Sequence, residues 1–357
     1  MKNMYKLLFI ILIPTIMFAN NYDGKYTKTK TVKKEFTVNK DALLNVSNKY
    51  GNIEIVTWNE NKIVFEIVIT TNGDNEDKVS ERLDDITIDF SNSISNVTAK
   101  TVIEKSNNWN WLGKNNNINF KINYNIKVPV TNHVDLTNDY GNILIDKLEG
   151  SSKINCDYGK LIIGSLFHKS NSINLDYAPL STISYVNEAK INADYSKLVI
   201  DKSNAISLNS DYSNNNFEQV DYLEFNGDYG NITIGNAKVV KGNSDYLVVK
   251  INSLSDKLVL HTDYGSIKIN ELKSGFSLVE LKSSYTGIKI GVDKIASFNI
   301  NATYSYGDIK YDDLNFTFNK KVQEKTSKNY EGFLNNSNSK SLVKINSTYG
   351  SSTFYSN

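Results

Sequence analysis

The chain has 357 residues, 40% of them hydrophobic, so it can bury a substantial core in one large domain or two. Its 40 basic and 39 acidic side chains leave almost no net charge, and Arg82 is the single arginine among them. This balance argues against the electrostatic attraction and the bidentate arginine contacts used in nucleic-acid binding. We therefore expect no nucleic-acid partner.

Residues 1–19, "MKNMYKLLFIILIPTIMFA", begin with a basic segment, continue through a short apolar run and end on the small residue Ala19. This layout is typical of a secretory signal peptide, and the apolar run is short for a membrane span. An uncleaved N-terminal anchor is the alternative. We expect an exported bacterial protein, periplasmic, on the outer surface or secreted, that contacts a membrane only through the signal peptide before cleavage.

Residues 20–130 are expected to form a β-rich N-terminal cap with one short helix. The segment "DNEDKVSERLDDI" predicts the helix, begun by Asp74 or Asn75. The segments "NVTAKTVIEK" and "INFKINYNIKVP" predict two strands that form a hairpin. A cap is expected on physical grounds, because an uncovered first strand would pair with other chains.

The tip of the predicted hairpin, "SNNWNWLGKNNN", places Trp109 and Trp111 two residues apart among polar neighbours. Two aromatic side chains on one face of an exposed loop could contact a sugar or a protein, which makes them candidate partner-binding residues. The alternative, which we favour, is that both fold down and pack on the helix or on the coil.

Residues 131–310 carry a repeat built on Asp-Tyr, as in "NDYGNILI", "CDYGKLII", "ADYSKLVI" and "GDYGNITI". The tyrosines recur at intervals of 17 to 19 residues, with one interval of 21, and this period with strand-like alternation predicts a solenoid. The series consists of Tyr140, Tyr158, Tyr177, Tyr195, Tyr212, Tyr229, Tyr246, Tyr264, Tyr285 and Tyr304.

Alternation assigns the faces of the strand before each tyrosine, because side chains two residues apart lie on the same side. The residue four before the tyrosine is apolar, as Ile154 is, and the residue two before is mostly small, as Cys156 is. By parity the tyrosine should also face inward, so Tyr212→Ala or Tyr229→Ala should leave a cavity costing about 3–5 kcal/mol. An outward tyrosine stripe at the turn is the alternative.

A small residue follows the tyrosine in most repeats, and an apolar pair follows that, as in Gly159, Leu161 and Ile163. Glycine suits a corner at which the backbone takes a positive φ. Each repeat is therefore expected to consist of a strand, a corner, a second strand and a loop.

Two polar columns have the opposite parity. Asparagine stands three before the tyrosine in six repeats, where amides can pair along the axis. Aspartate stands one before the tyrosine, and stacked like charges need an offset. That offset is either an Asx-turn at the corner, which we favour, or a Ca²⁺ ion held between repeats. The candidate partner-binding aspartates are Asp194, Asp211, Asp228 and Asp245.

Residues 311–357 are expected to form a C-terminal capping excursion followed by a last strand around Tyr349. The single thiol, Cys156, is expected in the core because no motif surrounds it or His168. The three histidines share no metal-ligand spacing, so we expect no metal and no cofactor.

The predicted fold is all-β: a right-handed parallel β-solenoid, or β-helix, of about ten coils of 17–21 residues, with an irregular N-terminal cap that contains one short helix. The order of "LNVSNKYGNIEIVTW", "YNIKVPVTNHVDLTNDYGNILIDKLEG" and the later Asp-Tyr-Gly repeats resembles the putative adhesin family of exported bacterial β-solenoid proteins, a domain of unknown function. The resemblance spans roughly residues 30 to 355 and implies surface interaction without established catalytic residues.

We expect a non-enzymatic adhesin or surface-interaction module that binds a surface glycan or protein. A structural envelope scaffold is the first alternative. The second is a β-helix enzyme that acts on polysaccharides, but such an enzyme would set a local acid cluster apart from the repeat, and here the acids recur uniformly.

Overall fold

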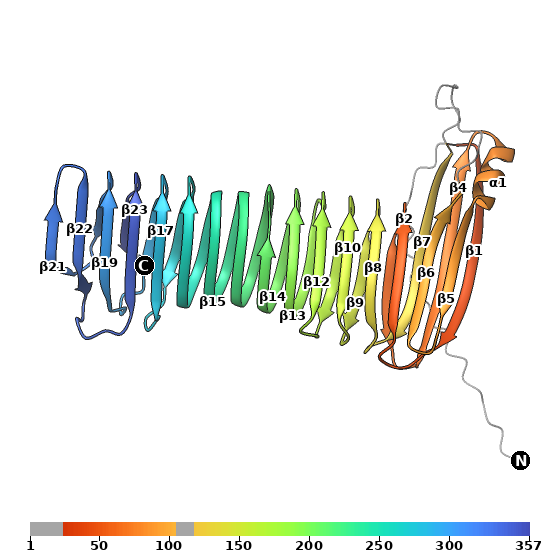
Figure 1. Cartoon of the computed structure of the whole chain (residues 1–357), viewed down its shortest axis with the longest axis horizontal. Helices are drawn as coiled ribbons and strands as arrows, with labels where there is room; N and C mark the ends of the chain where they lie inside the picture. Colours follow the sequence, from red (N-terminus) through yellow and green to blue (C-terminus); the bar gives the residue numbers. More distant parts are fainter. Residues whose placement is uncertain (1–23, 105–117) are drawn as a thin grey trace, which may run out of the picture.

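The computed structural model describes residues 24–104 and 118–357, which form one large mixed β-sheet and a single helix. The strands lie across the long axis of an elongated molecule (Figure 1). The expected all-β fold and the expected short helix are both confirmed.

The N-terminal part combines two antiparallel groups of strands. In the first, β4 (Lys62–Gly73) pairs with both β1 (Tyr26–Thr37) and β7 (Asn119–Pro129). In the second, β5 (Ile86–Asn92) pairs with β6 (Asn96–Ile103).

Helix α1 (Glu76–Asp84) lies against β1 and β4 at the right-hand end of Figure 1. It begins after Asn75, whose side chain accepts the Lys78 backbone N–H, so one of the two predicted caps is correct. Val79 is its buried anchor. The helix thus covers the strands of the first antiparallel group.

The first strands of the repeating part are β2 (Leu43–Lys49) and β3 (Ile53–Trp58). Strand β2 pairs in parallel with β6, and β3 pairs in parallel with β7. The predicted hairpin is therefore wrong: its two strands, β6 and β7, extend different rows of the sheet, because each finds a parallel partner in β2 or β3. The antiparallel strands beyond them cover this end of the sheet.

Strands of consecutive repeats pair in parallel and in register, as predicted. Within the row that precedes the tyrosines, Ile154 aligns with Leu136 on one side and with Ile173 on the other. This row contains β8 (His133–Asp139), β10 (Ser152–Asp157), β12 (Asn171–Asp176), β17 (Leu278–Ser284) and β19 (Phe298–Ser305), with parts of β13, β14 and β15.

The second row follows the tyrosines. It contains β9 (Ile143–Leu148), β11 (Leu161–Leu166), β16 (Ser266–Leu272), β18 (Gly287–Val292) and β20 (Ile309–Asp312). Strands β13 (Ser181–Asp194) and β14 (Lys197–Asn209) contribute to both rows. Strand β15 (Ser213–Asp263) continues through successive repeats without a break.

The C-terminal end differs from a simple continuation of the chain. The last strands, β23 (Leu342–Thr348) and β24 (Ser352–Ser356), insert between earlier strands: β23 lies between β17 and β19, and β24 between β18 and β20. The antiparallel pair β21 (Phe316–Gln323) and β22 (Ser327–Leu334) adds to the outer side of β19. Here too, antiparallel strands follow the last parallel one.

The core lies between the two rows. Residues four and two before the tyrosine are buried, as Ile154 and Cys156 show, and so is the apolar pair that follows it, as Leu161 and Ile163 show. Burial raises the pKa of the Cys156 thiol to about 12, so it is a packed core residue and a poor nucleophile, as expected.

The glycine after the tyrosine is required by close packing. A Cβ added to Gly159 would lie 1.9 Å from the Gly141 backbone oxygen of the preceding repeat. Its φ is not positive, so the sequence-based reason given for this glycine is wrong; of the glycines that follow a tyrosine, only Gly230 has a positive φ, at 148°.

We predict that Gly159→Ala destabilises the protein by about 1–3 kcal/mol or more, because the backbone of two repeats would have to separate. Gly287→Ala is the matched control: an added Cβ there meets no atom within 4 Å, so the change should stay within about 0.5 kcal/mol. Urea unfolding of both variants measures the difference. Equal stabilities would contradict the packing role.

Candidate functional site

Twelve tyrosines occupy the corners between the two rows, and all of them have left-handed backbone conformations. Their φ angles range from 49° to 61°, a region that bulky side chains rarely adopt. We call this set the tyrosine ladder. It consists, in spatial order, of Tyr50, Tyr140, Tyr158, Tyr177, Tyr195, Tyr212, Tyr229, Tyr246, Tyr264, Tyr285, Tyr349 and Tyr306.

The ladder faces solvent, so the predicted inward column is wrong and the alternative, an outward stripe, is correct. Each ladder side chain is 42–59% exposed. The prediction failed because it carried the two-residue alternation of the strand through the tyrosine. The left-handed residue ends that alternation and turns the chain, so the ring points away from the core.

The rings stack on one another along the whole ladder. Neighbouring ring centroids are 4.7–5.2 Å apart, and neighbouring planes differ by 1–10°. This spacing matches the separation of paired strands, about 4.8 Å. Ring faces are therefore turned toward neighbouring rings, and the ladder presents ring edges and hydroxyl groups to solvent.

The two ends of the ladder differ. At one end, Phe120 packs edge-on against Tyr50, with centroids 5.1 Å apart, and the Arg82 guanidinium lies 4.6 Å from the Phe120 centroid. At the other end, the predicted member Tyr304 is fully buried, with its hydroxyl next to that of Ser352, and Tyr306 takes the ladder position.

The column of candidate aspartates runs beside the ladder. Asp194 Oδ1 accepts the backbone N–H of Asp211 at 3.0 Å, and the contact recurs from Asp211 to Asp228 and from Asp228 to Asp245. These contacts join successive repeats, whereas the expected Asx-turn would join each carboxylate to its own corner. They place a carboxylate oxygen against a backbone donor at each step and so offset part of the repulsion.

Charge in this column is weakly compensated. The described ion pair within it joins Lys49 to Asp139 at 2.9 Å. Burial, followed by the carboxylates of Asp176 and Asp139, raises the pKa of Asp157. The described residues contain no group of three or more His, Cys, Asp or Glu side chains placed to hold a metal ion.

The asparagine column pairs as predicted over four repeats. The Asn174 amide donates to Asn155 at 2.6 Å, Asn192 to Asn174 at 2.8 Å, and Asn209 to Asn192 at 3.1 Å. The side-chain amides thus form a continuous chain along the axis beside the aspartates, which holds these repeats in register.

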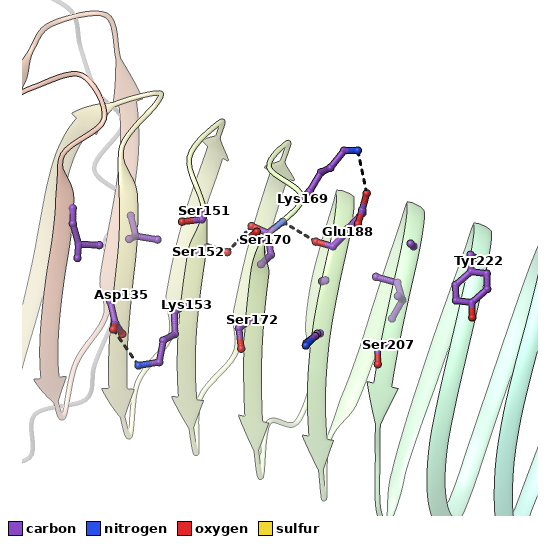
Figure 2. Close-up of a pocket in the computed structure, with 17 residues that line it drawn as sticks. Asp135, Ser151, Ser152, Lys153, Lys169, Ser170, Ser172, Glu188, Ser207 and Tyr222 are labelled. Carbon is purple, nitrogen blue, oxygen red and sulfur yellow. Dashed lines mark hydrogen bonds and ion pairs between the residues drawn. The ribbon is translucent and has the colours of Figure 1, made fainter.

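A shallow groove of about 620 Å³ lies at the start of the first-row strands, at the end away from the ladder. Figure 2 shows serines on its wall, including Ser170 and Ser207, and Tyr222 at one end. The sequence analysis did not identify this groove; the small residues seven before the tyrosine, such as Ser151 and Ala205, were its signal.

Both acids in the groove are ion-paired. Asp135 contacts Lys153 at 3.1 Å, and Glu188 contacts Lys169 at 3.7 Å (Figure 2). The nearby ring of His133 accepts the Ser151 backbone N–H at 2.9 Å through Nδ1. These charged groups of the groove therefore have polar partners, and apolar side chains such as Val134 and Ile206 form much of the remaining lining.

Trp109 and Trp111 lie outside the described residues. Among the residues that the structure does describe, no helix is long and apolar enough to cross a membrane.

Comparisons with known proteins find similar solved structures. No protein-family model and no curated protein matches the chain. A putative adhesin from Bacteroides fragilis NCTC 9343 is 17% identical, with a TM-score of 0.36 over 67% of this chain and 96% of that one. A putative adhesin from Parabacteroides merdae ATCC 43184 is 11% identical, with a TM-score of 0.37 over 68% and 97%.

A putative cell adhesion protein from Clostridium sporogenes ATCC 15579 is 11% identical, with a TM-score of 0.20 over 92% of this chain and 100% of that one. The chain is thus similar to proteins described as putative adhesins, in agreement with the resemblance found in the sequence. At TM-scores this low, the likeness carries no argument about function.

We predict that Tyr212→Ala costs about 1–3 kcal/mol, because it removes two stacking contacts and some buried area but opens no core cavity. Tyr212→Asn should cost less, because asparagine tolerates the left-handed conformation, and Tyr212→Val should cost most. Denaturant unfolding gives the order. Tyr304→Ala, in the core, is the contrast and should cost about 3–5 kcal/mol; a Tyr212 effect of that size would contradict the outward assignment.

We predict that Asp157→Asn raises the melting temperature at pH 7. The raised pKa means that the folded state binds this proton more tightly than the unfolded state, so stability falls as pH rises from the ordinary aspartate pKa to the folded-state value. The gain should disappear near pH 3, where both states are protonated. Asp135→Asn, which breaks an exposed ion pair, should give no gain. A lower melting temperature for Asp157→Asn at pH 7 would show that the carboxylate is held by a stabilising contact.

Proposed function

We propose that the chain is an exported, non-enzymatic, right-handed β-solenoid that acts as an adhesin or surface-interaction module and makes its contacts through the tyrosine ladder. The observation that carries this proposal is the ladder itself: twelve half-exposed aromatic side chains in one continuous stripe. A contiguous exposed stripe of this kind is more often an interaction surface than a surface without a partner.

The backbone of the ladder supports an interaction role over that of a scaffold alone. Glycine or asparagine would occupy a left-handed corner with little strain, whereas a tyrosine there costs roughly 1–2 kcal/mol. Stacking offsets that strain, but the other half of each ring stays in water. A scaffold requires the corner and has no use for the exposed ring edges and hydroxyl groups.

The hydroxyl groups define what a partner meets. Burial by neighbouring rings, then the adjacent tyrosines and aspartates, raise the pKa of Tyr158, Tyr195 and Tyr229 above the ordinary tyrosine value. These three phenols therefore stay protonated at neutral pH and can donate as well as accept hydrogen bonds. A partner with polar groups at a regular spacing can bond to several of them at once.

A polysaccharide-active enzyme is the less supported reading. A glycosidase needs two carboxyl groups with distinct roles beside a bound sugar. In the groove, Asp135 and Glu188 are each held by a lysine, and beside the ladder the aspartates repeat uniformly. The pKa of Asp157 is raised, but this residue aligns with Asp139 and Asp176 at equivalent positions of neighbouring strands, so it belongs to the repeat.

The proposal is tested by binding of the chain without its first 19 residues to a glycan array and to whole bacterial and animal cells. The variant Tyr195→Asn, Tyr212→Asn and Tyr229→Asn removes the centre of the ladder and retains residues suited to the left-handed corner. Its binding should fall at least about tenfold, since aromatic anchors carry most of the binding free energy. The single variant Tyr185→Asn, outside the ladder, is the control. Unchanged binding of the triple variant would refute the ladder as the contact surface.

A further inference from the structure

We infer that the tyrosine ladder of one molecule packs side by side against the ladder of a second copy of the same chain. This inference rests on the proposed function, because it names the partner of the same surface. Its basis is that a second copy has the same repeat period as the ladder, together with the exposed area of the ladder and the charge on either side of it.

The period of the ladder restricts its partners. Ring centroids recur every 4.7–5.2 Å over twelve positions, because backbone pairing fixes the separation of the repeats. A partner with another period loses register after a few repeats. A second copy has the same period at every step, so each hydroxyl group can meet an equivalent group in the same geometry.

The area is sufficient for a stable dimer. A tyrosine buries about 150–250 Å² when covered, and about half of each ladder side chain is still exposed. The twelve side chains together therefore offer roughly 900–1,500 Å² per molecule, against the roughly 800 Å² per partner of a standard interface.

Charge favours one arrangement. The aspartates lie on the first-row side of the ladder, while the residues two after the tyrosines, on the second-row side, are mostly uncharged, as Asn214 is, with Lys160 and Lys197 among them. A two-fold axis parallel to the long axis of the molecule sets the aspartates of one copy against the lysine and asparagine side of the other. A two-fold axis across the long axis sets aspartates against aspartates, which is unfavourable.

Contact along the ladder uses a long edge of the molecule and leaves the ends of the sheet uninvolved. Antiparallel strands β4 and β7 lie beyond one end of the parallel rows, and β21 and β22 lie beyond the other, so the ladder repeats of two molecules do not meet directly at these ends. The tips of β8, β10 and β12, each followed at once by a ladder tyrosine, point to one long edge of the molecule (Figure 1). That edge is free along the described repeats.

Sedimentation equilibrium over a range of protein concentrations tests the inference. The wild-type chain should form dimers, and the triple variant Tyr195→Asn, Tyr212→Asn and Tyr229→Asn should weaken the dimer at least about tenfold. Tyr185→Asn should dimerise like wild type. A wild-type chain that is monomeric throughout, or a dimer unaffected by the triple variant, would overturn the inference.

Cross-linking with a bismaleimide long enough to span two tyrosine side chains gives a second, independent measurement, in a Cys156→Ala background. A direct disulfide would not report the contact, because it needs Cα atoms within about 7 Å of each other. With the two-fold axis along the molecule, Tyr140→Cys should cross-link to itself. With the axis across it, Tyr140→Cys should cross-link to Tyr349→Cys in a mixture, because these positions are second from opposite ends of the ladder. Either product supports pairing of ladders and assigns its direction, and the absence of both would overturn it.

The two proposals fail in distinguishable ways. If the wild-type chain stays monomeric while the triple variant loses its binding to cells or glycans, the second copy is refuted and the ladder remains the interaction surface. If dimers form through the ladder and the triple variant binds cells and glycans as well as wild type does, self-association stands and the wider role in surface interaction fails.

Discussion

Parallel backbone pairing between successive repeats is the constraint on which the other features depend. It places each residue about one strand spacing from its counterpart in the next repeat, so any side chain used once per repeat meets its own kind along the axis. The consequence depends on the chemistry of that side chain. Asparagine amides donate to one another, tyrosine rings stack, and aspartates repel unless each finds another donor. One geometric rule therefore yields two stabilising columns and one that is costly.

The ladder balances two opposing contributions to stability. Each left-handed tyrosine is strained by roughly 1–2 kcal/mol, and each stacked pair returns about 0.5–1.5 kcal/mol, so the net effect per repeat is small. Hydrogen bonds through the corner add to the stacking: the Tyr158 N–H donates to the Asp176 carbonyl of the next repeat at 2.9 Å, and Tyr212 does the same toward Asp228. The parallel row thus continues through the turn without a gap. Stability alone does not select tyrosine at this corner, which leaves the exposed edge of the ring as the property that distinguishes it from asparagine or glycine.

Local periodicity was enough to predict the elements, the parallel register and the buried positions such as Ile154 and Cys156, because these follow from alternation and from the repeat length. Periodicity failed at Tyr158 and its equivalents, where one residue with φ near 53° ends the alternation. No sequence pattern signals that change to the left-handed backbone region. Periodicity also failed at Tyr304, where the interval of 19 fitted the repeat, yet Tyr306 occupies the corner. The groove was missed because small side chains create it: Ser151, Ser170 and Ala205 leave space where larger residues would fill it. Small residues alone do not signal a groove in a sequence.

The inserted C-terminal strands were beyond sequence reasoning for a different reason. A repeat pattern predicts that neighbours in sequence are neighbours in space, yet β17 pairs with β23, with Leu281 beside Ile345, across 64 residues of chain. The strand β19 must therefore leave room for β23, and β22 then covers β19 from the outside. Because β23 and β24 complete rows on both sides at once, this end of the sheet cannot be fully formed until the last residues of the chain are in place. The entropy lost in closing so long a loop is recovered only when both rows pair, which couples the stability of residues 298–357 into one unit.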